Sequence, residues 1–378
     1  MMLQYCERCE REAVHGNLWC QDPDCPAENA YALMGYGEFL GDLKVDRLIR
    51  VWRTAALYEA FRNDEKVFLK IAHPGDDYAE RLRNETAALR SMTPSPAGVG
   101  AFLRSFLPQS RSLYPVPLSP YPSRSKQPYG EISYLGEPRV YAVYQHSTGK
   151  ILSDILLETP QIWHTQAAWL MITICGALRP LVRGKKCHLS INPDIILVDT
   201  DEDGFFRPML LDLGFLLETT ESGAGYDWSK LLEPAYSAPE ILTASPNGVH
   251  SLAADVYSLG MIYFEMLAGR PAFRNIVRRD GQLMEQVTQE RKPLNVGRPE
   301  LQQSGVTTVL DSAVAYSGRY QNASEFSKAL RKIYSSPPAE KRKLPTRTWV
   351  IIILVAIVSI ILGIIGAATL LQILFGAA

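Results

Sequence analysis

The stretch His188-Leu-Ser-Ile-Asn-Pro-Asp-Ile-Ile-Leu197 decides the fold of this chain. It begins with a histidine, carries Ser190 and Asn192 before a proline, and ends in an aliphatic run. Other short motifs surround it along the chain: Val67–Lys70, Arg81–Leu89, Leu210–Gly214, Ser237–Glu240 and Asp255–Gly260. Each is weak alone, because an isolated Asp-x-Gly usually marks only a turn. Together, in this order and at this spacing, they are difficult to obtain by chance.

The opening stretch resembles the catalytic loop of protein kinases, His-Arg-Asp-Leu-Lys-Pro-x-Asn. Ser190 stands where the family has the Asp that accepts the proton of the substrate hydroxyl. Asn192 replaces the family's Lys, and Ile195 replaces the Asn that holds a second magnesium ion. Because the framework residues His188 and Pro193 are kept, the resemblance implies a fold that is retained and a reaction that is lost.

Three of the surrounding motifs are similar to the nucleotide-binding parts of kinases: Val67–Lys70, Arg81–Leu89 and Leu210–Gly214. Lys70 matches the strand lysine that contacts the α- and β-phosphates, and Glu85 matches its partner on the next helix. Asp212 matches the magnesium ligand of the Asp-Phe-Gly motif. The resemblance implies that these three residues are the remainder of a nucleotide site.

The glycine-rich loop of the family is expected between the first two strands of the small lobe. Its three glycines, which let backbone N–H groups approach phosphates, fall on Arg50, Trp52 and Ala55. Trp52 and Arg53 are expected to project into or beside the phosphate space. The usual phosphate clamp is therefore predicted to be absent.

Further residues match positions that hold the kinase fold together. Asp255 is expected to cap the backbone of the catalytic-like loop, and Arg319 to pair with Glu240. The resemblance implies an α+β, bilobal protein-kinase-like fold over residues 42–334, with a small lobe at about 42–145 and a large lobe at about 146–334. Residues 93–138, which are rich in Pro, Ser, Tyr and Gly, are expected to form an enlarged loop, as a partner surface or as filler.

The N-terminus carries four of the six cysteines of the chain, in two pairs. The pairs Cys6/Cys9 and Cys20/Cys25 can hold one tetrahedral zinc ion between two knuckles. A module this small cannot bury enough apolar surface to fold alone, and a cytoplasmic location disfavours the alternative of two disulfides. We therefore expect a structural zinc ribbon over residues 1–32, joined to the kinase-like domain by a linker at residues 35–41.

The C-terminal end is a candidate membrane span. No charged residue occurs from Trp349 to Phe375, and about 20 apolar residues suffice to cross a bilayer. The linker 335–348 is rich in Pro and Lys, and the basic residues before the helix are Lys341, Arg342, Lys343 and Arg347. The positive-inside rule therefore predicts a single-pass helix at 349–375, with the N-terminal region in the cytoplasm.

Small residues recur at every fourth position of this helix, at Ser359, Gly363 and Ala367. Such spacing lets two helices approach closely and suggests a homodimer, although chance explains it equally well in a segment rich in small residues. The 378-residue chain has a net charge of −1, which argues against bulk binding of nucleic acid.

The sequence predicts a membrane-anchored pseudokinase that binds cytoplasmic signalling proteins as a scaffold or regulator, with little or no phosphoryl transfer. The order of ribbon, kinase-like domain and anchor is similar to that of bacterial serine/threonine-kinase-like signalling proteins. The alternative is a divergent active serine/threonine kinase, or a nucleotide-binding switch, that uses Lys70 and Asp212. Structural zinc is expected, whereas binding of ATP and magnesium stays open.

Overall fold

The structure is a computed structural model. It describes residues 3–5, 12–13, 31–92, 112–120, 127–134, 136–221, 226, 228–243, 250–273, 280–289, 295–302, 304–339 and 346–375. The chain divides into two units, one with residues 1–93 and 112–338 and the other with residues 94–111 and 339–378.

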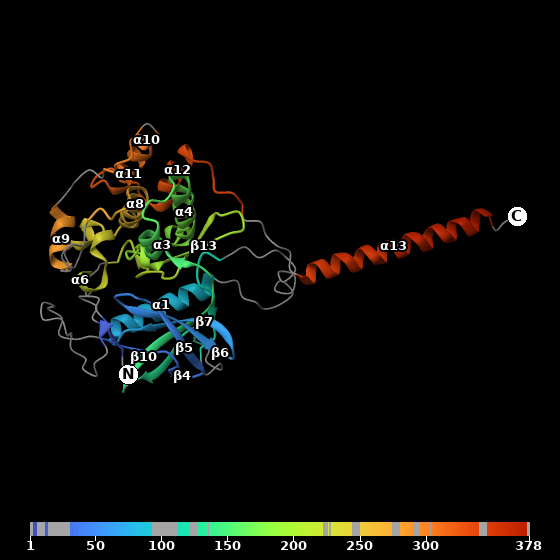
Figure 1. The fold of residues 1–378 in the computed structure, drawn as a ribbon, viewed down its shortest axis with the longest axis horizontal. Coiled ribbons are helices and arrows are strands. Elements are labelled where there is room, and N and C mark those ends of the chain that lie inside the picture. Colours follow the sequence, from blue (N-terminus) through green and yellow to red (C-terminus); the bar gives the residue numbers. More distant parts are fainter. Residues whose placement is uncertain are drawn as a thin grey trace. The chain divides into compact units, whose positions relative to one another are not determined.

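The first unit contains a seven-stranded antiparallel sheet that forms the small lobe (Figure 1). The strand order is β4-β5-β6-β7-β10-β8, and β9 pairs with β10. The strands are β4 (Phe39–Leu40), β5 (Leu43–Val51), β6 (Ala55–Arg62), β7 (Glu65–Ala72), β8 (Pro117–Leu118), β9 (Gly130–Tyr134) and β10 (Glu137–Gln145). The strands β8 and β9 come from the stretch that was expected to be an enlarged loop, so part of it extends the sheet.

The hairpin of β6 and β7 sets the direction of Lys70. Asn63 and Asp64 both have positive φ, at 49° and 65°, as a two-residue type I′ turn requires, and Arg62 then pairs with Glu65. Side chains alternate along β7, so Phe68, Lys70 and Ala72 share one face and their neighbours the other. Both faces are buried at this point. The ammonium of Lys70 is thereby placed inside the lobe.

Helix α1 (Asp76–Met92) carries the partner of Lys70. Acidic Asp76 and Asp77 in its first turn and Arg90 in its last turn complement the helix dipole. Its buried positions include Arg81 and Glu85, which lie four residues apart and therefore on the same face. The helix presents one cation and one carboxylate to the interior.

Helices build the large lobe around α4 (His164–Ala177) and α8 (Leu252–Ala268), which are buried over most of their lengths. The other helices are α3 (Leu152–Glu158), α5 (Arg179–Arg183), α6 (Trp228–Leu231), α7 (Pro239–Leu242), α9 (Asp280–Gln289), α10 (Pro299–Gln302), α11 (Val306–Val314) and α12 (Ala323–Ile333). The core of this lobe continues into the sheet through Leu57, Phe68 and Tyr144. The two lobes therefore share one hydrophobic core.

Short strands frame the catalytic-like loop. β13 (Ile196–Thr200) lies between β11 (Lys150–Ile151) and β14 (Phe206–Leu210), and β12 (Lys186–Cys187) pairs with β15 (Leu217–Glu218). The loop runs from β12 to β13 and ends in a 3₁₀ turn at Pro193–Ile195. A second 3₁₀ turn, Pro234–Tyr236, precedes α7.

The prediction that residues 35–41 form a linker is wrong. The N–H of Gly37 donates to the carbonyl of Val45 at 2.9 Å, β4 pairs with β5, and Leu40 is 1% exposed. The segment is part of the small lobe because the burial of Leu40 and the pairing of β4 fix it there. Ahead of it, β3 (Tyr31–Leu33) pairs with β1 (Leu3–Tyr5), which also pairs with β2 (Glu12–Ala13).

The predicted zinc ligands Cys6, Cys9, Cys20 and Cys25 lie outside the described residues. Within the ranges given above, no group of three or more His, Cys, Asp or Glu side chains is placed to hold a metal. The zinc ribbon therefore stays a prediction.

The second unit contains α13 (Thr346–Phe375). Its window Thr348–Ala367 has a mean hydropathy of 3.2, so the helix is long and apolar enough to cross a membrane. Ser359, Gly363 and Ala367 lie on this helix, and the dimer they suggest stays a prediction. The basic residues Lys341, Arg342 and Lys343 are not among the described residues.

Candidate functional site

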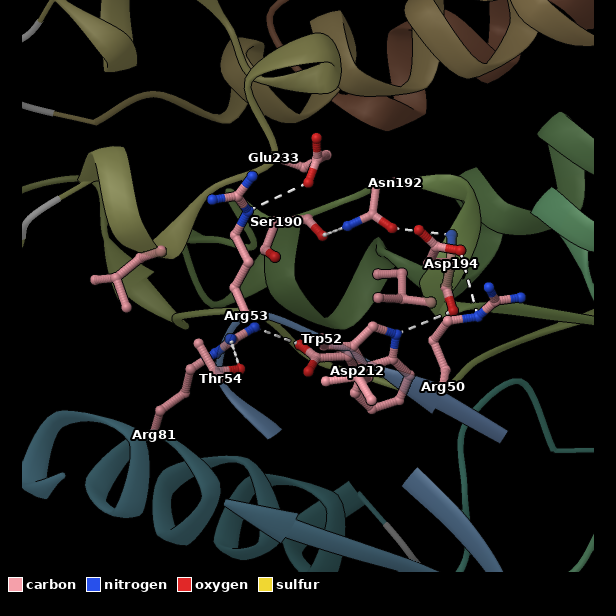
Figure 2. A pocket seen from close by; sticks show the side chains of 13 residues that line it. Arg50, Trp52, Arg53, Thr54, Arg81, Ser190, Asn192, Asp194, Asp212 and Glu233 are labelled. Atoms are coloured by element: carbon pink, nitrogen blue, oxygen red, sulfur yellow. Dashed lines mark hydrogen bonds and ion pairs between the residues drawn. The ribbon is translucent and has the colours of Figure 1, made fainter. Parts of the chain in front are cut away.

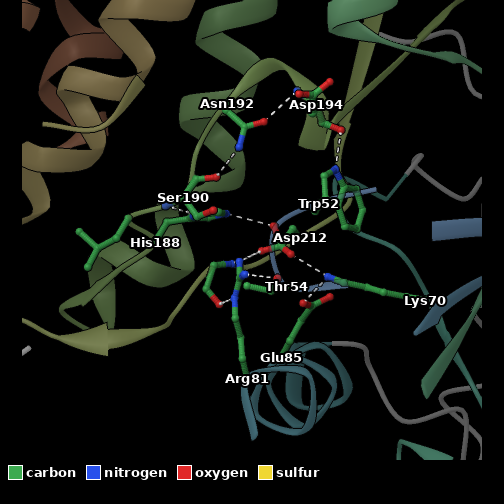
Figure 3. Close-up of polar contacts among 12 residues, drawn as sticks. Trp52, Thr54, Lys70, Arg81, Glu85, His188, Ser190, Asn192, Asp194 and Asp212 are labelled. Atoms are coloured by element: carbon green, nitrogen blue, oxygen red, sulfur yellow. Dashed lines mark hydrogen bonds and ion pairs between the residues drawn. The ribbon is translucent and has the colours of Figure 1, made fainter. Parts of the chain in front are cut away.

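Three residues from distant parts of the chain meet in a buried cluster (Figure 3). The ammonium Nζ of Lys70 lies 2.5 Å from Oε2 of Glu85 and 2.7 Å from Oδ2 of Asp212. None of the three side chains is more than 2% exposed. The expected Lys70–Glu85 ion pair is present, and Asp212 joins it from the segment that follows β14.

Arg81 binds the other carboxylate oxygen of Asp212. Its Nη2 lies 2.7 Å from Oδ1 of Asp212, and its Nε donates to the carbonyl of Gly214 at 3.2 Å. Nη1 also donates to the hydroxyl of Thr54, and the guanidinium lies 4.4 Å from the centre of the Phe215 ring. One guanidinium thus joins α1, the β5–β6 turn and the Asp212–Phe215 segment.

The cluster balances its charges without a metal ion. Two cations, Lys70 and Arg81, face two carboxylates, Glu85 and Asp212. Burial pushes the pKa of Asp212 upward, but the charges of Arg81 and Lys70 outweigh burial and hold that pKa well below its usual range. Burial raises the pKa of Glu85, against the pull of Lys70. Lys70 and Arg81 therefore stabilise the charged form of Asp212 more than that of Glu85.

The catalytic-like loop is held by its own polar groups. The amide of Asn192 donates to the carbonyl of Ser190 at 3.2 Å and accepts from the N–H of Asp194 at 2.9 Å. Nε2 of His188 donates to the carbonyl of Asp212 at 3.1 Å. Asn192 is thus used inside the loop, and Ser190 offers only a hydroxyl where the family has a carboxylate.

The expected supports of the loop are confirmed. Asp255 accepts from the N–H groups of His188 and Leu189 at 2.9 and 2.8 Å, which stabilises Leu189 at a φ of 63°. Burial raises the pKa of Asp255 to about 6, although these two hydrogen bonds lower it. Arg319 donates to Glu240 at 2.5 and 3.3 Å.

A cavity of about 110 Å³ lies between the β5–β6 turn and the catalytic-like loop (Figure 2). Its walls include Arg50, Trp52, Arg53, Ser190, Asn192 and Glu233. Pockets that hold small organic ligands usually measure about 300–1,000 Å³. The enclosed space of this cavity is below that range.

Arg81 and Phe68 are among the residues of the site that were not anticipated from the sequence. Arg81 stands four residues before Glu85, and this spacing on one helix face is a signal that sequence reasoning could have used. Phe68 replaces the Ala of the family's Val-Ala-Ile-Lys motif two residues before Lys70. Phe68 is 1% exposed and its ring lies 4.8 Å from that of His146, so it fills space on the same strand face as Lys70.

His73 makes the site sensitive to acid. Its Nε2 donates to the carbonyl of Trp52 at 2.8 Å, and burial lowers its pKa to about 4. The unfolded chain, with a histidine pKa of about 6.5, binds the proton first, so stability falls as the pH drops from about 6.5 to about 4. The contribution of His73 to this loss is on the order of 3 kcal/mol.

We expect His73→Gln, which cannot titrate, to lose less stability on acidification than the wild type. Urea unfolding of both proteins at pH 7 and at pH 4.5 measures the difference. The gap between their unfolding free energies should narrow by 1 kcal/mol or more, on the order of the His73 contribution. A gap that stays constant with pH would show that His73 titrates normally in the folded protein.

The family model described as the protein kinase domain matches residues 132–336. This range begins in β9 and ends after α12, so it includes Ser190, Asp212 and Asp255 but not Lys70 or Glu85.

Curated relatives include serine/threonine kinases from animals and bacteria. Serine/threonine-protein kinase DCLK3 of Mus musculus is 27% identical over 153 residues, which are 40% of this chain and 18% of the relative. A probable serine/threonine-protein kinase of Corynebacterium efficiens is 27% identical over 144 residues, 38% of this chain and 21% of the relative. Serine/threonine-protein kinase PknB of Mycobacterium leprae is 24% identical over 224 residues, 57% of this chain and 34% of the relative. The match thus spans between about a fifth and a third of these relatives.

Proposed function

This chain belongs to the protein kinase family, and we propose that it is a pseudokinase: a membrane-anchored member that binds partner proteins and transfers little or no phosphate. The observation that carries this proposal is the buried cluster in which Lys70 and Arg81 take both carboxylate oxygens of Asp212. In an active kinase that Asp holds magnesium, and magnesium must reach its oxygens directly. Here protein cations already neutralise it.

The catalytic-like loop supports the same proposal. Ser190 replaces the proton acceptor, and a serine hydroxyl is a far weaker base than a carboxylate. Ile195, which is 2% exposed, replaces the second metal ligand by an apolar side chain. Proton acceptor, second metal ligand and glycine loop are all replaced, so restoring one would not restore the reaction.

The groups that hold the domain together are kept, which favours binding as its function. Asp255 still holds the catalytic-like loop, and Arg319 still joins Glu240. A chain that had lost every role would not need these buried polar contacts, since each is costly to bury unless it is satisfied. We propose that the retained surface binds cytoplasmic signalling proteins as a scaffold or regulator.

The proposal places the domain at a membrane through α13. The helix has the length and hydropathy of a span. Lys341, Arg342 and Lys343 precede it, and Arg347 lies in its first turn. On this proposal the kinase-like domain faces the cytoplasm. Zinc held by Cys6, Cys9, Cys20 and Cys25 as a structural ion, and pairing of two helices through Ser359, Gly363 and Ala367, are parts of the same proposal.

One experiment tests location and activity together. We expect the full chain to stay in the membrane pellet after a carbonate wash and to be released by detergent. The released protein, incubated with radiolabelled ATP and magnesium or manganese, should label neither itself nor a generic basic protein above the level of Lys70→Ala. Labelling that disappears in Lys70→Ala would establish the alternative, a divergent active kinase that uses Lys70 and Asp212.

A further inference from the structure

The end of β5 and the turn that follows it reach across to the large lobe through three side chains (Figure 2). Arg50 lies 2.5 Å from Asp154 on α3 and 3.5 Å from Asp194 in the 3₁₀ turn of the catalytic-like loop. Arg53 lies 3.2 Å from Glu233, just before the second 3₁₀ turn. Arg50 at the end of β5 and Arg53 in the turn thus attach this part of the small lobe to separate elements of the large lobe.

Trp52 lies between these arginines and covers Lys70. Its ring centre is 4.9 Å from the ammonium of Lys70, and its indole N–H donates to the carbonyl of Asp194 at 3.2 Å. The side chain is 8% exposed. Since the lysine at this position contacts nucleotide phosphates in the family, the indole occupies the space that phosphates need.

The backbone of the turn is fixed from the small lobe. The N–H of Trp52 donates to the carbonyl of Ala55 at 2.8 Å, and its own carbonyl accepts from His73. Trp52 is therefore anchored on one lobe through its backbone and on the other through its indole. Neither contact needs a ligand.

We propose that Arg50, Trp52 and Arg53, hereafter the latch, act as a built-in ligand that holds the two lobes closed with no nucleotide present. This inference rests on the proposed function and deepens it, because it says why the binding surface stays in one arrangement. In an active kinase a nucleotide bridges the lobes; here the indole does so, and the arginines hold it in place.

The parts of the latch differ in how firmly they hold. The Arg50 and Arg53 side chains are 25% and 14% exposed, and their partners Asp154 and Glu233 are 45% and 25% exposed. Salt screens such pairs, whereas it does not weaken a buried indole packed on an ammonium to the same degree. Trp52 is therefore the part on which closure depends.

Hydrogen exchange tests the latch on the full chain in detergent. We expect Trp52→Gly to speed backbone exchange in residues 190–195 by about tenfold or more, because the variant loses the indole that holds the lobes closed. A tenfold change in the opening equilibrium corresponds to about 1.4 kcal/mol. Trp52→Phe, which keeps a ring but loses the donor to Asp194, should give a smaller increase. Arg47→Gln is the matched control, because Arg47 is on β5 but its partner, Glu59 at 2.8 Å, is in the same lobe.

The exchange rates of these variants decide whether the latch holds the lobes closed. Circular dichroism and cooperative unfolding serve as the check that Trp52→Gly is folded. Trp52→Phe repeats the exchange experiment with a milder change. Wild-type exchange rates in both variants would overturn the latch, and so would equal acceleration by Arg47→Gln. Stabilisation of the wild type by millimolar ATP would also overturn it, because ATP would then enter the space assigned to the indole. Phosphate transfer by the wild type would instead contradict the proposed pseudokinase function, independently of the exchange rates that test the latch.

Discussion

Replacing Asp212 by alanine should destabilise the folded protein by about 3–5 kcal/mol, since removal of one partner leaves a buried charge uncompensated. Lys70 would keep Glu85, but Arg81 would lose its only carboxylate among the contacts described above. The effect separates two roles for Asp212. Removing a carboxylate that serves only to bind magnesium should cost little stability. Removing a carboxylate that pairs two buried cations should cost much, because the cations lose their counter-charge.

Denaturant unfolding of the full chain in detergent, followed by tryptophan fluorescence, measures the loss. Glu158→Ala is the control, because Glu158 pairs with Lys150 at 2.8 Å while both side chains are 61% exposed. Such a pair contributes at most about 1 kcal/mol. An Asp212→Ala protein as stable as Glu158→Ala would show that the cations of the cluster find water or other partners, and would remove the main support for a metal-free site.

Sequence reasoning could predict the cluster in part. The motifs around Lys70, Glu85 and Asp212 place each residue on a known element of the kinase fold, so their meeting follows once the fold is identified. The same holds for Asp255 and for the Arg319–Glu240 pair. These residues act through the backbone or through one partner, so a motif is enough to place them.

The remaining contacts depend on side-chain directions that no motif fixes. Arg81 could have pointed to solvent, as most helix arginines do; its burial follows from the joint demands of Asp212, Gly214 and Thr54. For Trp52 the sequence predicted bulk near the phosphate space but not the hydrogen bond to Asp194. That hydrogen bond joins the small lobe to the large lobe. It therefore depends on how the two lobes pack together, which no single motif predicts.

The error at residues 35–41 has a different physical cause. Gly35, Gly37 and Gly41 are typical of a flexible connection. Two of them instead serve two separate turns, one before and one after β4, where Gly37 and Gly41 have φ values of 79° and 63°. Leu40 packs into the core of the sheet between these turns. Glycine composition alone cannot distinguish a loose linker from a turn that needs left-handed backbone.

The second large effect is expected at Gly214, where the Asp212 segment presses against the catalytic-like loop. Gly214 has a φ of 68°, and a Cβ there would collide with the carbonyl oxygen and a ring nitrogen of His188. Its N–H donates to Asp212 at 2.5 Å and its carbonyl accepts from Arg81. We expect Gly214→Ala to cost about 3 kcal/mol or more, since left-handed strain and overpacking each cost about 1–3 kcal/mol.

Gly318→Ala separates these two causes. Gly318 has a similar φ of 75°, but a Cβ there meets nothing within 4 Å, so only the backbone strain of about 1–2 kcal/mol remains. The difference between the two variants in denaturant unfolding therefore measures how tightly Gly214 is packed on His188. Equal losses would mean that the loop moves away at little cost, and the Asp212 cluster would then not depend on the catalytic-like loop for its position. A larger loss in Gly214→Ala means that packing against the catalytic-like loop fixes the position of the Asp212 cluster.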